Sequence, residues 1–315
     1  MKMSERQFVD FLLGEVGSRA GRDAKRLPQG LKLREGIGDD CAVIVWTAKK
    51  DLLITTDMLI EDVHFRRDWQ TAKSAGHKAL ARGLSDIAAM GGTPKLAFLS
   101  LSLSKKTLGK WAKDFVHGFL TLAQATGVTL AGGDTGASLG GVFSDVMVIG
   151  EAPRGKAILR SGARAGDEIW VTGQLGGASA TLERLLAGKS ATFHPTPKLG
   201  VGRMLRERAL ASAMIDLSDG LSIDLASLCK RSGTGAVLVQ EAVPRAVHAS
   251  QKNALHGGED LELLFTVPQQ QVRRVPSAWE GVLLTRIGEI IGGRKLWLEN
   301  GGKKTLLPVM GFEHF

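Results

Sequence analysis

Acidic residues recur in this sequence at the ends of apolar runs, beside glycine, serine or threonine. The set comprises Asp39, Asp40, Asp57, Asp86, Asp134, Asp216, Asp219, Glu259 and Asp260. Carboxylate oxygens suit hard cations such as Mg²⁺, and phosphoryl transfer depends mainly on positioning and charge neutralisation. The amides of neighbouring glycines could cradle phosphate oxygens. One such acid alone is more often a turn residue or a helix cap, but together they favour Mg²⁺-dependent phosphoryl transfer.

The stretch 77–92 (HKALARGLSDIAAMGG) carries the most informative of these acids. Leu80, Leu84 and Ile87 recur at helical spacing and predict one apolar face. Asp86 lies off that stripe, on the side expected to remain open, where a solvated surface position is the ordinary alternative. The small residues around it allow another backbone or an anion to approach closely.

Several well-known catalytic motifs are absent from the sequence. It contains no GxxxxGK[ST] phosphate loop, no GxGxxG after a strand and no HExxH. Gly188-Lys189-Ser190 imitates the end of a phosphate loop, but Glu183 stands where the first glycine is required. The scattered histidines give no zinc-ligand pattern. Dinucleotide binding and zinc chemistry therefore have no support.

Composition bounds the class of protein. With 315 residues, we expect one large or two ordinary domains. The net charge of +9 is dispersed in short basic doublets without interleaved aromatic residues, which indicates a generally basic surface and no nucleic-acid groove. The two cysteines, Cys41 and Cys229, form no disulfide framework and are expected in the core.

The N-terminus reads as an amphipathic helix. Ser4 is its expected cap, with Gln7 three residues later. Acidic residues interrupt this segment, so it does not resemble a signal peptide. No apolar run of about 18 residues occurs, so we expect no membrane span and a cytoplasmic protein.

Strands and helices mix irregularly along the chain. Strands are expected at 43–46, 52–57, 95–104, 128–131, 142–150, 168–172, 213–217, 261–266, 285–290 and 295–298, with extended chain at 58–65. Beyond 77–92, helices are expected near 107–126, 177–186, after Pro197 and at 224–231. Because some strands follow one another directly, the pattern favours an α+β fold with mixed or antiparallel sheets. Pro153 and Gly155 place a domain boundary between residues 153 and 154.

Eight segments resemble the thiamine-monophosphate kinase family over nearly the whole chain. They are GIGDDCAV (36–43), TTDMLIEDVHF (55–65), HKALARGLSDIAAMGG (77–92), AGGDT (131–135), RSGARAGD (160–167), IDLSDGLSIDL (215–225), GGEDLELLFT (257–266) and GFEHF (311–315). The wider superfamily includes aminoimidazole ribonucleotide synthetases, selenophosphate synthetases and hydrogenase-maturation proteins. TTDMLIEDVHF and GFEHF favour the thiamine-phosphate branch.

The resemblance implies a fold and a reaction. The fold would be a two-domain PurM-like α+β structure, with an N-terminal ATP- and Mg²⁺-binding and dimerisation domain over 1–153 and a C-terminal domain over 154–315 completing the site. The reaction would be direct in-line transfer of the γ-phosphoryl group of ATP to thiamine monophosphate, with several Mg²⁺ ions and a homodimeric enzyme.

Site residues carry over from the family motifs position by position. The metal positions are Asp40, Thr55, Thr56, Asp57, Asp86, Asp134, Asp216 and Asp219, of which Asp57, Asp134 and Asp219 are expected to be essential for turnover. The ATP positions are Gly133, Asp134, Arg160 and Ser218, and the thiamine-phosphate positions are His64, Glu259 and Phe312. Arg160 could pair with a phosphate as a planar fork, and an aromatic ring at 312 could stack on the cationic thiazolium.

The sequence departs from the family pattern at a few positions. Gly136 and Ala137 stand where a basic residue often follows GGDT, Leu261 replaces a tyrosine, and Gly83 replaces an asparagine. Phe312 replaces a tyrosine or tryptophan and lacks their hydrogen-bonding group. These changes concern substrate affinity more than reaction class, since no metal carboxylate is lost.

Two other functions remain as alternatives. A selenophosphate-synthetase-like enzyme would need a reactive cysteine in a glycine-rich N-terminal loop, whereas Cys41 begins the apolar run CAVIVW and reads as packing. A basic nucleic-acid-binding or scaffold protein is disfavoured by the dispersed charge, and by carboxylates that would repel phosphates in the absence of metal.

Overall fold

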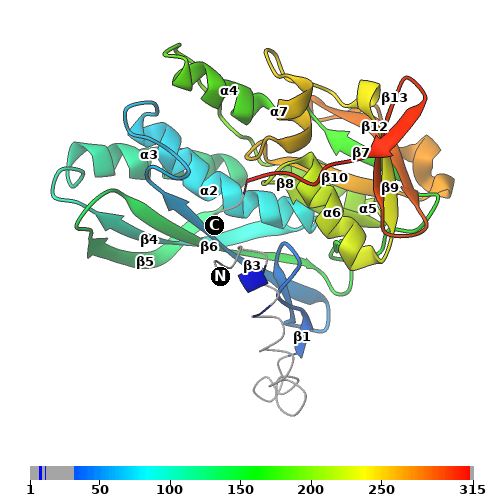
Figure 1. Cartoon of the computed structure of the whole chain (residues 1–315). Helices are drawn as coiled ribbons and strands as arrows, with labels where there is room; N and C mark the ends of the chain where they lie inside the picture. The colour runs from blue at the N-terminus through cyan, green and yellow to red at the C-terminus, as the bar shows by residue number, and fades with distance from the viewer. Residues whose placement is uncertain (1–6, 9–10, 12–31, 313–315) are drawn as a thin grey trace.

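The computed structural model describes residues 7, 8, 11 and 32–312 (Figure 1). In this part of the chain, residues 32–153 build one β-sheet and residues 168–306 build a second. Most strand pairs are antiparallel, while β4–β5 and β9–β13 are parallel. The predicted α+β fold with mixed sheets is therefore confirmed. The helix predicted at the N-terminus, with its Ser4 cap, lies largely outside the described residues.

The first sheet has helices on one face. Its strand order is β1 (Lys32–Glu35), β2 (Ala42–Val45), β3 (Lys50–Ile60), β6 (Phe143–Pro153), β4 (Thr93–Leu103) and β5 (Thr129–Ala137). Helix α2 (Ala72–Ala89) packs on β3 and β6, and α3 (Lys110–Thr126) packs beside α2. The alternating burial of β6, with Val146 and Val148 fully buried, identifies the face that α2 covers.

Glycines allow α2 and α3 to touch backbone to backbone. A Cβ atom at Gly76 would lie 1.9 Å from the carbonyl oxygen of Phe115, and one at Gly118 would lie 1.9 Å from that of Lys73. Phe115 and Phe119, on α3, are fully buried in the same contact. A larger residue at either glycine would push the helices apart and open this core.

The second sheet is larger and carries the C-terminal helices. Its order is β14 (Lys303–Leu306), β13 (Leu296–Asn300), β9 (Gly235–Val239), β12 (Val282–Ile291), β7 (Glu168–Thr172), β10 (Glu262–Val267) and β8 (Ala213–Leu217), with β11 (Ala278–Trp279) paired to β12. The α-helices of this half are α4 (Gly177–Leu186), α5 (Leu199–Glu207), α6 (Leu221–Ser232) and α7 (Gln251–His256).

Helix α2 is the element that joins the two halves (Figure 1). It contacts α5, β8 and β10 of the second half as well as its own sheet. Ala88 and Ala89 are fully buried in a hydrophobic cluster with Leu205, Met214 and Phe265. The expectation that one side of this helix stays open was wrong, because a second domain packs there. The expected close approach of another element to its small residues is confirmed.

Three further expectations differ from the structure. Strand β3 ends at Ile60, and residues 61–65 form a turn that includes Asp62 at φ 65°, so His64 does not lie on extended chain. Strand β5 continues through the glycine-rich GGDTGA segment where a loop was expected. Strands β1, β9, β11 and β14 and helix α7 were not predicted, because short elements give little periodicity.

Candidate active site

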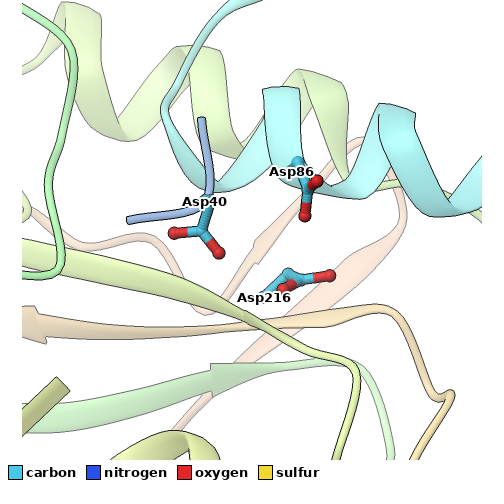
Figure 2. Close-up of side chains that lie close together, drawn as sticks. All are labelled: Asp40, Asp86 and Asp216. Carbon is cyan, nitrogen blue, oxygen red and sulfur yellow. The ribbon is translucent and has the colours of Figure 1, made fainter. Parts of the chain in front are cut away.

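Three carboxylates from distant parts of the chain converge between the two halves. Asp40 lies in the loop before β2, Asp86 on α2 and Asp216 on β8. One oxygen from each lies within 4.8 Å of the others (Figure 2). All three belong to the predicted metal positions. Oxygen donors at this spacing fit a hard divalent cation.

Neighbouring hydroxyl groups hold two of these carboxylates in place. Thr55 Oγ1, on β3, donates a hydrogen bond to Asp86 Oδ2. Ser85 Oγ donates to Asp216 Oδ2 at 2.7 Å, and this bond crosses from α2 to the second sheet. Ser85 is fully buried and Asp216 is 3% exposed. The cluster is thus oriented by both halves of the molecule.

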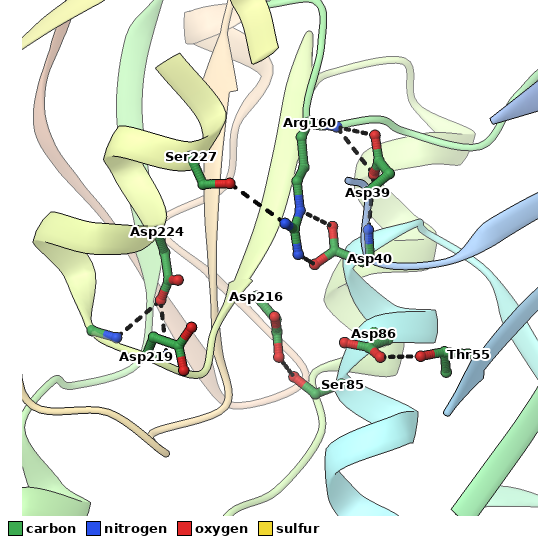
Figure 3. A network of polar contacts seen from close by, with 11 residues as sticks. Asp39, Asp40, Thr55, Ser85, Asp86, Arg160, Asp216, Asp219, Asp224 and Ser227 are labelled. Atoms are coloured by element: carbon green, nitrogen blue, oxygen red, sulfur yellow. Dashed lines mark hydrogen bonds and ion pairs between the residues drawn. The ribbon is translucent and has the colours of Figure 1, made fainter. Parts of the chain in front are cut away.

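Arg160 binds the third carboxylate from the segment that connects the two sheets. Its Nη2 lies 2.8 Å from Asp40 Oδ1 and its Nε lies 3.2 Å from Asp40 Oδ2, which is a two-point contact (Figure 3). The Arg160 backbone N–H donates to both oxygens of Asp39, at 3.1 and 3.3 Å. Nη1 also reaches Ser227 Oγ, on α6, at 3.4 Å. Arg160 therefore lies beside the carboxylate cluster, where it can meet an anion bound there.

The cluster carries more negative charge than its surroundings neutralise. Burial, reinforced by the Asp40 carboxylate, raises the pKa of Asp216 to about 8. Burial, together with Asp57 and Asp216, raises the pKa of Asp86 well above its usual range. The physical cause is the desolvation and mutual repulsion of ionised groups. A bound cation would relieve both, so the electrostatics fit a metal site as well as the geometry does.

The turn before α6 brings Ser218 and Asp219 to the same region. Asp224, in the first turn of α6, accepts hydrogen bonds from the N–H groups of Asp219 and Gly220 at 3.2 and 3.0 Å (Figure 3). Gly220 has φ 127°, a conformation that favours glycine. The Asp219 carbonyl oxygen accepts from the Phe312 N–H at 3.1 Å. This turn therefore links the carboxylate region to the C-terminal segment.

The predicted substrate residues gather near Lys78, on α2. The rings of His64 and Phe312 lie 6.1 Å apart. Lys78 Nζ, on α2, lies 2.6 Å from both the His64 carbonyl oxygen and Glu259 Oε2. Glu259 comes from the second half, where its N–H donates to the Ser218 carbonyl oxygen at 2.7 Å. The structure thus brings together the three predicted substrate positions, His64, Glu259 and Phe312.

Arg82 connects this group to Asp57. Its Nε and Nη2 lie 3.2 and 3.1 Å from Asp57 Oδ1, and its Nη1 lies 3.3 Å from Glu259 Oε1. Burial raises the pKa of Asp57, and the charge of Arg82 opposes that shift. Two carboxylates and two cations thus face one another beside the His64 and Phe312 rings.

The structure places Thr56, Gly133 and Asp134 apart from the cluster. Strand pairing traces Asp134 across the first sheet. Asp134 on β5 lies opposite Ser100 on β4, and Ser100 lies opposite Asp145 on β6. Asp145 in turn lies opposite Met58 on β3. Residues directly opposite in neighbouring strands share a face, so Asp134 lies on the face of Met58. Thr56 lies on that face as well, whereas Thr55 and Asp57 lie on the α2 face. Gly133 is on edge strand β5, close against β4, where a Cβ atom would lie 1.9 Å from the Leu99 carbonyl oxygen.

Sequence reasoning missed four residues of this region, namely Lys78, Arg82, Ser85 and Asp224. A signal for two of them was present, because Lys78, Arg82 and Asp86 follow one another at intervals of four and so share one stripe of α2. Ser85 had no comparable signal, since its partner Asp216 is 131 residues away. Asp224 acts only through the backbone of the preceding turn.

Family models match both halves of the chain. The AIR synthase related protein N-terminal domain matches residues 38–152, and the corresponding C-terminal domain matches residues 164–299. A thiamine-monophosphate kinase from Salmonella typhimurium is 37% identical over 309 residues, covering 90% of this chain and 93% of that protein. One from Rhodopirellula baltica is 33% identical over 312 residues, covering 93% and 91%.

This chain belongs to the thiamine-monophosphate kinase family. A solved structure described as AaThiL complexed with AMPPCP and TMP superposes with a TM-score of 0.83 at 28% identity, covering 100% of this chain and 99% of that one. As a thiamine-monophosphate kinase family member, the chain has the expected two-domain PurM-like fold, so both the recognition and the fold class are confirmed.

Two further expectations concern other classes of protein. Both cysteines are buried, as predicted. Burial, reinforced by the negative charge of Asp86, raises the pKa of Cys41 well above its usual range. A thiol in that setting is a poor nucleophile, which disfavours the selenophosphate-synthetase-like alternative. Among the helices of the described residues, none is long and apolar enough to cross a membrane.

Proposed function

We propose that this protein transfers the γ-phosphoryl group of ATP to thiamine monophosphate, giving thiamine diphosphate and ADP. The observation that carries this function is the identity of 33–37% to thiamine-monophosphate kinases over about nine-tenths of the chain. The relative described as complexed with AMPPCP and TMP has the same fold throughout. The carboxylate cluster between the two halves supports the same reaction class.

Magnesium is the metal that the donor set fits. Asp40, Asp86 and Asp216 would hold it, with Asp57 and Asp219 nearby for further ions. Bound Mg²⁺ would neutralise the polyphosphate and the charge that develops during transfer. The hydroxyl groups of Thr55 and Ser85 keep two of the carboxylates oriented toward the same point.

Residues around this cluster bind the nucleotide in this proposal. Arg160 presents a guanidinium group beside Asp40, where it can bind a phosphate of ATP as a planar fork. Ser218 and Asp219, in the turn before α6, extend this surface. We assign Gly133 and Asp134 to ATP and metal binding from the family motif alone, since both lie apart from the cluster within a single chain. Direct in-line transfer is part of this proposal and comes from the family resemblance.

The acceptor side is formed by His64, Glu259 and Phe312. The two rings pack against each other and together offer an aromatic surface to a ligand ring, and a carboxylate beside them suits the positively charged thiazolium. We assign residues 1–153 to ATP binding, metal binding and dimerisation, and residues 154–315 to completion of the nucleotide and substrate site.

A homodimer is part of this proposal. The face of the first sheet opposite α2 carries Met58, which is 49% exposed, and Leu96 and Phe143, which are each 37% exposed. No described helix of the chain packs on that face (Figure 1). A second copy covering it would bury this apolar surface. Light scattering of the purified protein should give twice the monomer mass of 33.6 kDa, and a monomeric mass would remove this part of the proposal.

The deciding experiment supplies ATP, Mg²⁺ and thiamine monophosphate to the purified protein. Thiamine diphosphate should form, as detected by chromatography, and EDTA should abolish its formation. Folded protein that binds ATP yet makes no product would keep the superfamily fold and exclude this acceptor.

A further inference from the structure

Arg82 lies between two carboxylates, Asp57, which we assign to metal, and Glu259, which we assign to the substrate. It contacts Asp57 Oδ1 at 3.1 Å and Glu259 Oε1 at 3.3 Å, and its side chain is only 16% exposed. Asp57 comes from β3 in the first half and Glu259 from the loop before β10 in the second. A guanidinium group presents donors in a fixed fork, so it can hold two anionic groups at once.

Lys78 lies one helical turn earlier and binds the same Glu259 carboxylate. Its Nζ is 2.6 Å from Glu259 Oε2, and its side chain is 9% exposed. Glu259 is fixed from its own side, because it has φ 68° and its N–H donates to the Ser218 carbonyl oxygen. A buried lysine and a buried arginine converging on one carboxylate form the same donor array that a phosphate group requires.

Thiamine monophosphate carries complementary charges. The phosphate is joined through a two-carbon chain to the thiazolium ring, which has a fixed positive charge. The group formed by Lys78, Arg82 and Glu259 has two cations and one anion, and it lies beside the His64 and Phe312 rings. The protein ion pairs and the substrate could therefore exchange partners without leaving a buried charge unpaired.

We propose that Arg82, together with Lys78, binds the phosphate of thiamine monophosphate, while Glu259 turns its carboxylate toward the positively charged ring. This inference rests on the proposed function and names the residues that select a phosphorylated acceptor. In this arrangement, Arg82 leaves Asp57 when the acceptor phosphate arrives, which frees that carboxylate for a metal ion. Arg82 is thus a specificity-determining residue, because unphosphorylated thiamine cannot replace the contacts that it gives up.

The test measures binding of thiamine monophosphate and of thiamine by calorimetry, in EDTA and without ATP. Arg82→Met should weaken thiamine monophosphate binding about 10- to 100-fold and leave thiamine binding unchanged. Arg82→Lys keeps the charge and should lose about 3- to 10-fold, because the two-point contact is gone. Lys73→Met, on an exposed position of the same helix, is the matched control and should bind both ligands as the wild type does.

The outcomes separate this inference from the function on which it rests. Equal losses for thiamine monophosphate and thiamine in Arg82→Met would overturn the inference, as would unchanged binding of both. Should Arg82→Met fail to fold by circular dichroism, the Arg82→Lys variant decides by the same comparison. A wild type that turns over thiamine monophosphate with Mg²⁺ but does not bind it in EDTA would also overturn it, since metal would then hold the phosphate. A wild type that never makes thiamine diphosphate would instead refute the function.

Discussion

Helix α2 carries two opposite electrostatic arrangements within two turns. Around Asp86, Arg160 is the one cation of the described residues that pairs directly with any of the three carboxylates. Around Arg82 and Lys78, the two cations meet two carboxylates, Asp57 and Glu259. The first region has excess negative charge, which bound metal ions would neutralise. The second region is neutral, and in our proposal its ion pairs are replaced by contacts with the charged groups of the substrate. One stripe of this helix can therefore present metal and nucleotide near Asp86 and a zwitterionic acceptor near Arg82 and Lys78.

The sharpest test of the anionic region is Asp86→Asn. It removes the carboxylate on which Thr55 and the neighbouring aspartates converge, and kcat should fall about 10²- to 10³-fold. Initial rates of thiamine diphosphate formation at saturating Mg²⁺ measure the effect. Asp114→Asn, at an exposed ion pair on α3, should keep the wild-type rate. A variant at Asp86 with normal turnover would place the metal elsewhere.

Asp57→Asn, Asp134→Asn and Asp219→Asn extend this test around the cluster. Each should also lower kcat severely, because each carboxylate is assigned to metal. Asp134 is the most informative of them, since it lies on the other face of the first sheet. Near-normal rates in all three variants would contradict the proposed metal cluster.

Metal binding should stabilise the anionic region against unfolding. At a Mg²⁺ concentration about 100 times the Kd, binding contributes about 2.7 kcal/mol, because the ion relieves the repulsion among Asp40, Asp86 and Asp216. Thermal denaturation in Mg²⁺ and in EDTA measures the difference in Tm. The increase should disappear in the Asp86→Asn and Asp216→Asn double variant, and an unchanged increase there would mean that the ion binds at another site.

The neutral region should respond to the loss of its shared anion. Glu259→Gln leaves Lys78 and Arg82 facing each other, so the free energy of unfolding should fall by about 1–3 kcal/mol. This is less than the cost of breaking a fully buried pair, because the Glu259 side chain is 28% exposed. Urea unfolding measures the change, and Glu207→Gln, at an exposed pair, should change it little. A fully stable Glu259→Gln protein would mean that this region is not held together by charge.

Stability in EDTA should also depend on pH through Asp216. Its pKa is raised to about 8 in the folded protein and lies near 4 in an unfolded chain. Between these values the folded state binds more protons, so this group's contribution to stability is lost as the pH rises from about 4 to 8. The Asp216→Asn variant does not lose this contribution. The Tm of the variant minus that of the wild type should therefore increase by a few degrees as the pH rises from about 4 to 8. A constant difference in Tm would show that Asp216 does not titrate in that window.

Phe312→Ala should have the smallest effect. The ring is 40% exposed and packs beside His64, so its removal should raise the KM for thiamine monophosphate about 3- to 10-fold and leave kcat nearly unchanged. Steady-state kinetics measures both constants. A large fall in kcat would instead show that the C-terminal segment positions the reacting groups.

Much of the local structure follows from the sequence. The boundaries of β7 at Glu168–Thr172 and α4 at Gly177–Leu186 were predicted to the residue, because alternating or helical apolar patterns are bounded there by glycines. The pattern also identified which acids could do chemistry. It did not identify Lys78 and Arg82, whose spacing from Asp86 in steps of four residues became informative only once the buried face of α2 was known.

The sequence by itself determined most of the longer elements, the family and the set of candidate acids. Only the tertiary structure decided which acids share a site. Strand side chains alternate, so Thr55 and Asp57 face α2 while Thr56 does not. The irregularity in the pairing of β4 with β5 near Phe98 inserts one residue and sets the face on which Asp134 lies. A one-residue shift in register reverses the face of every following side chain, and only long-range strand pairing fixes that register.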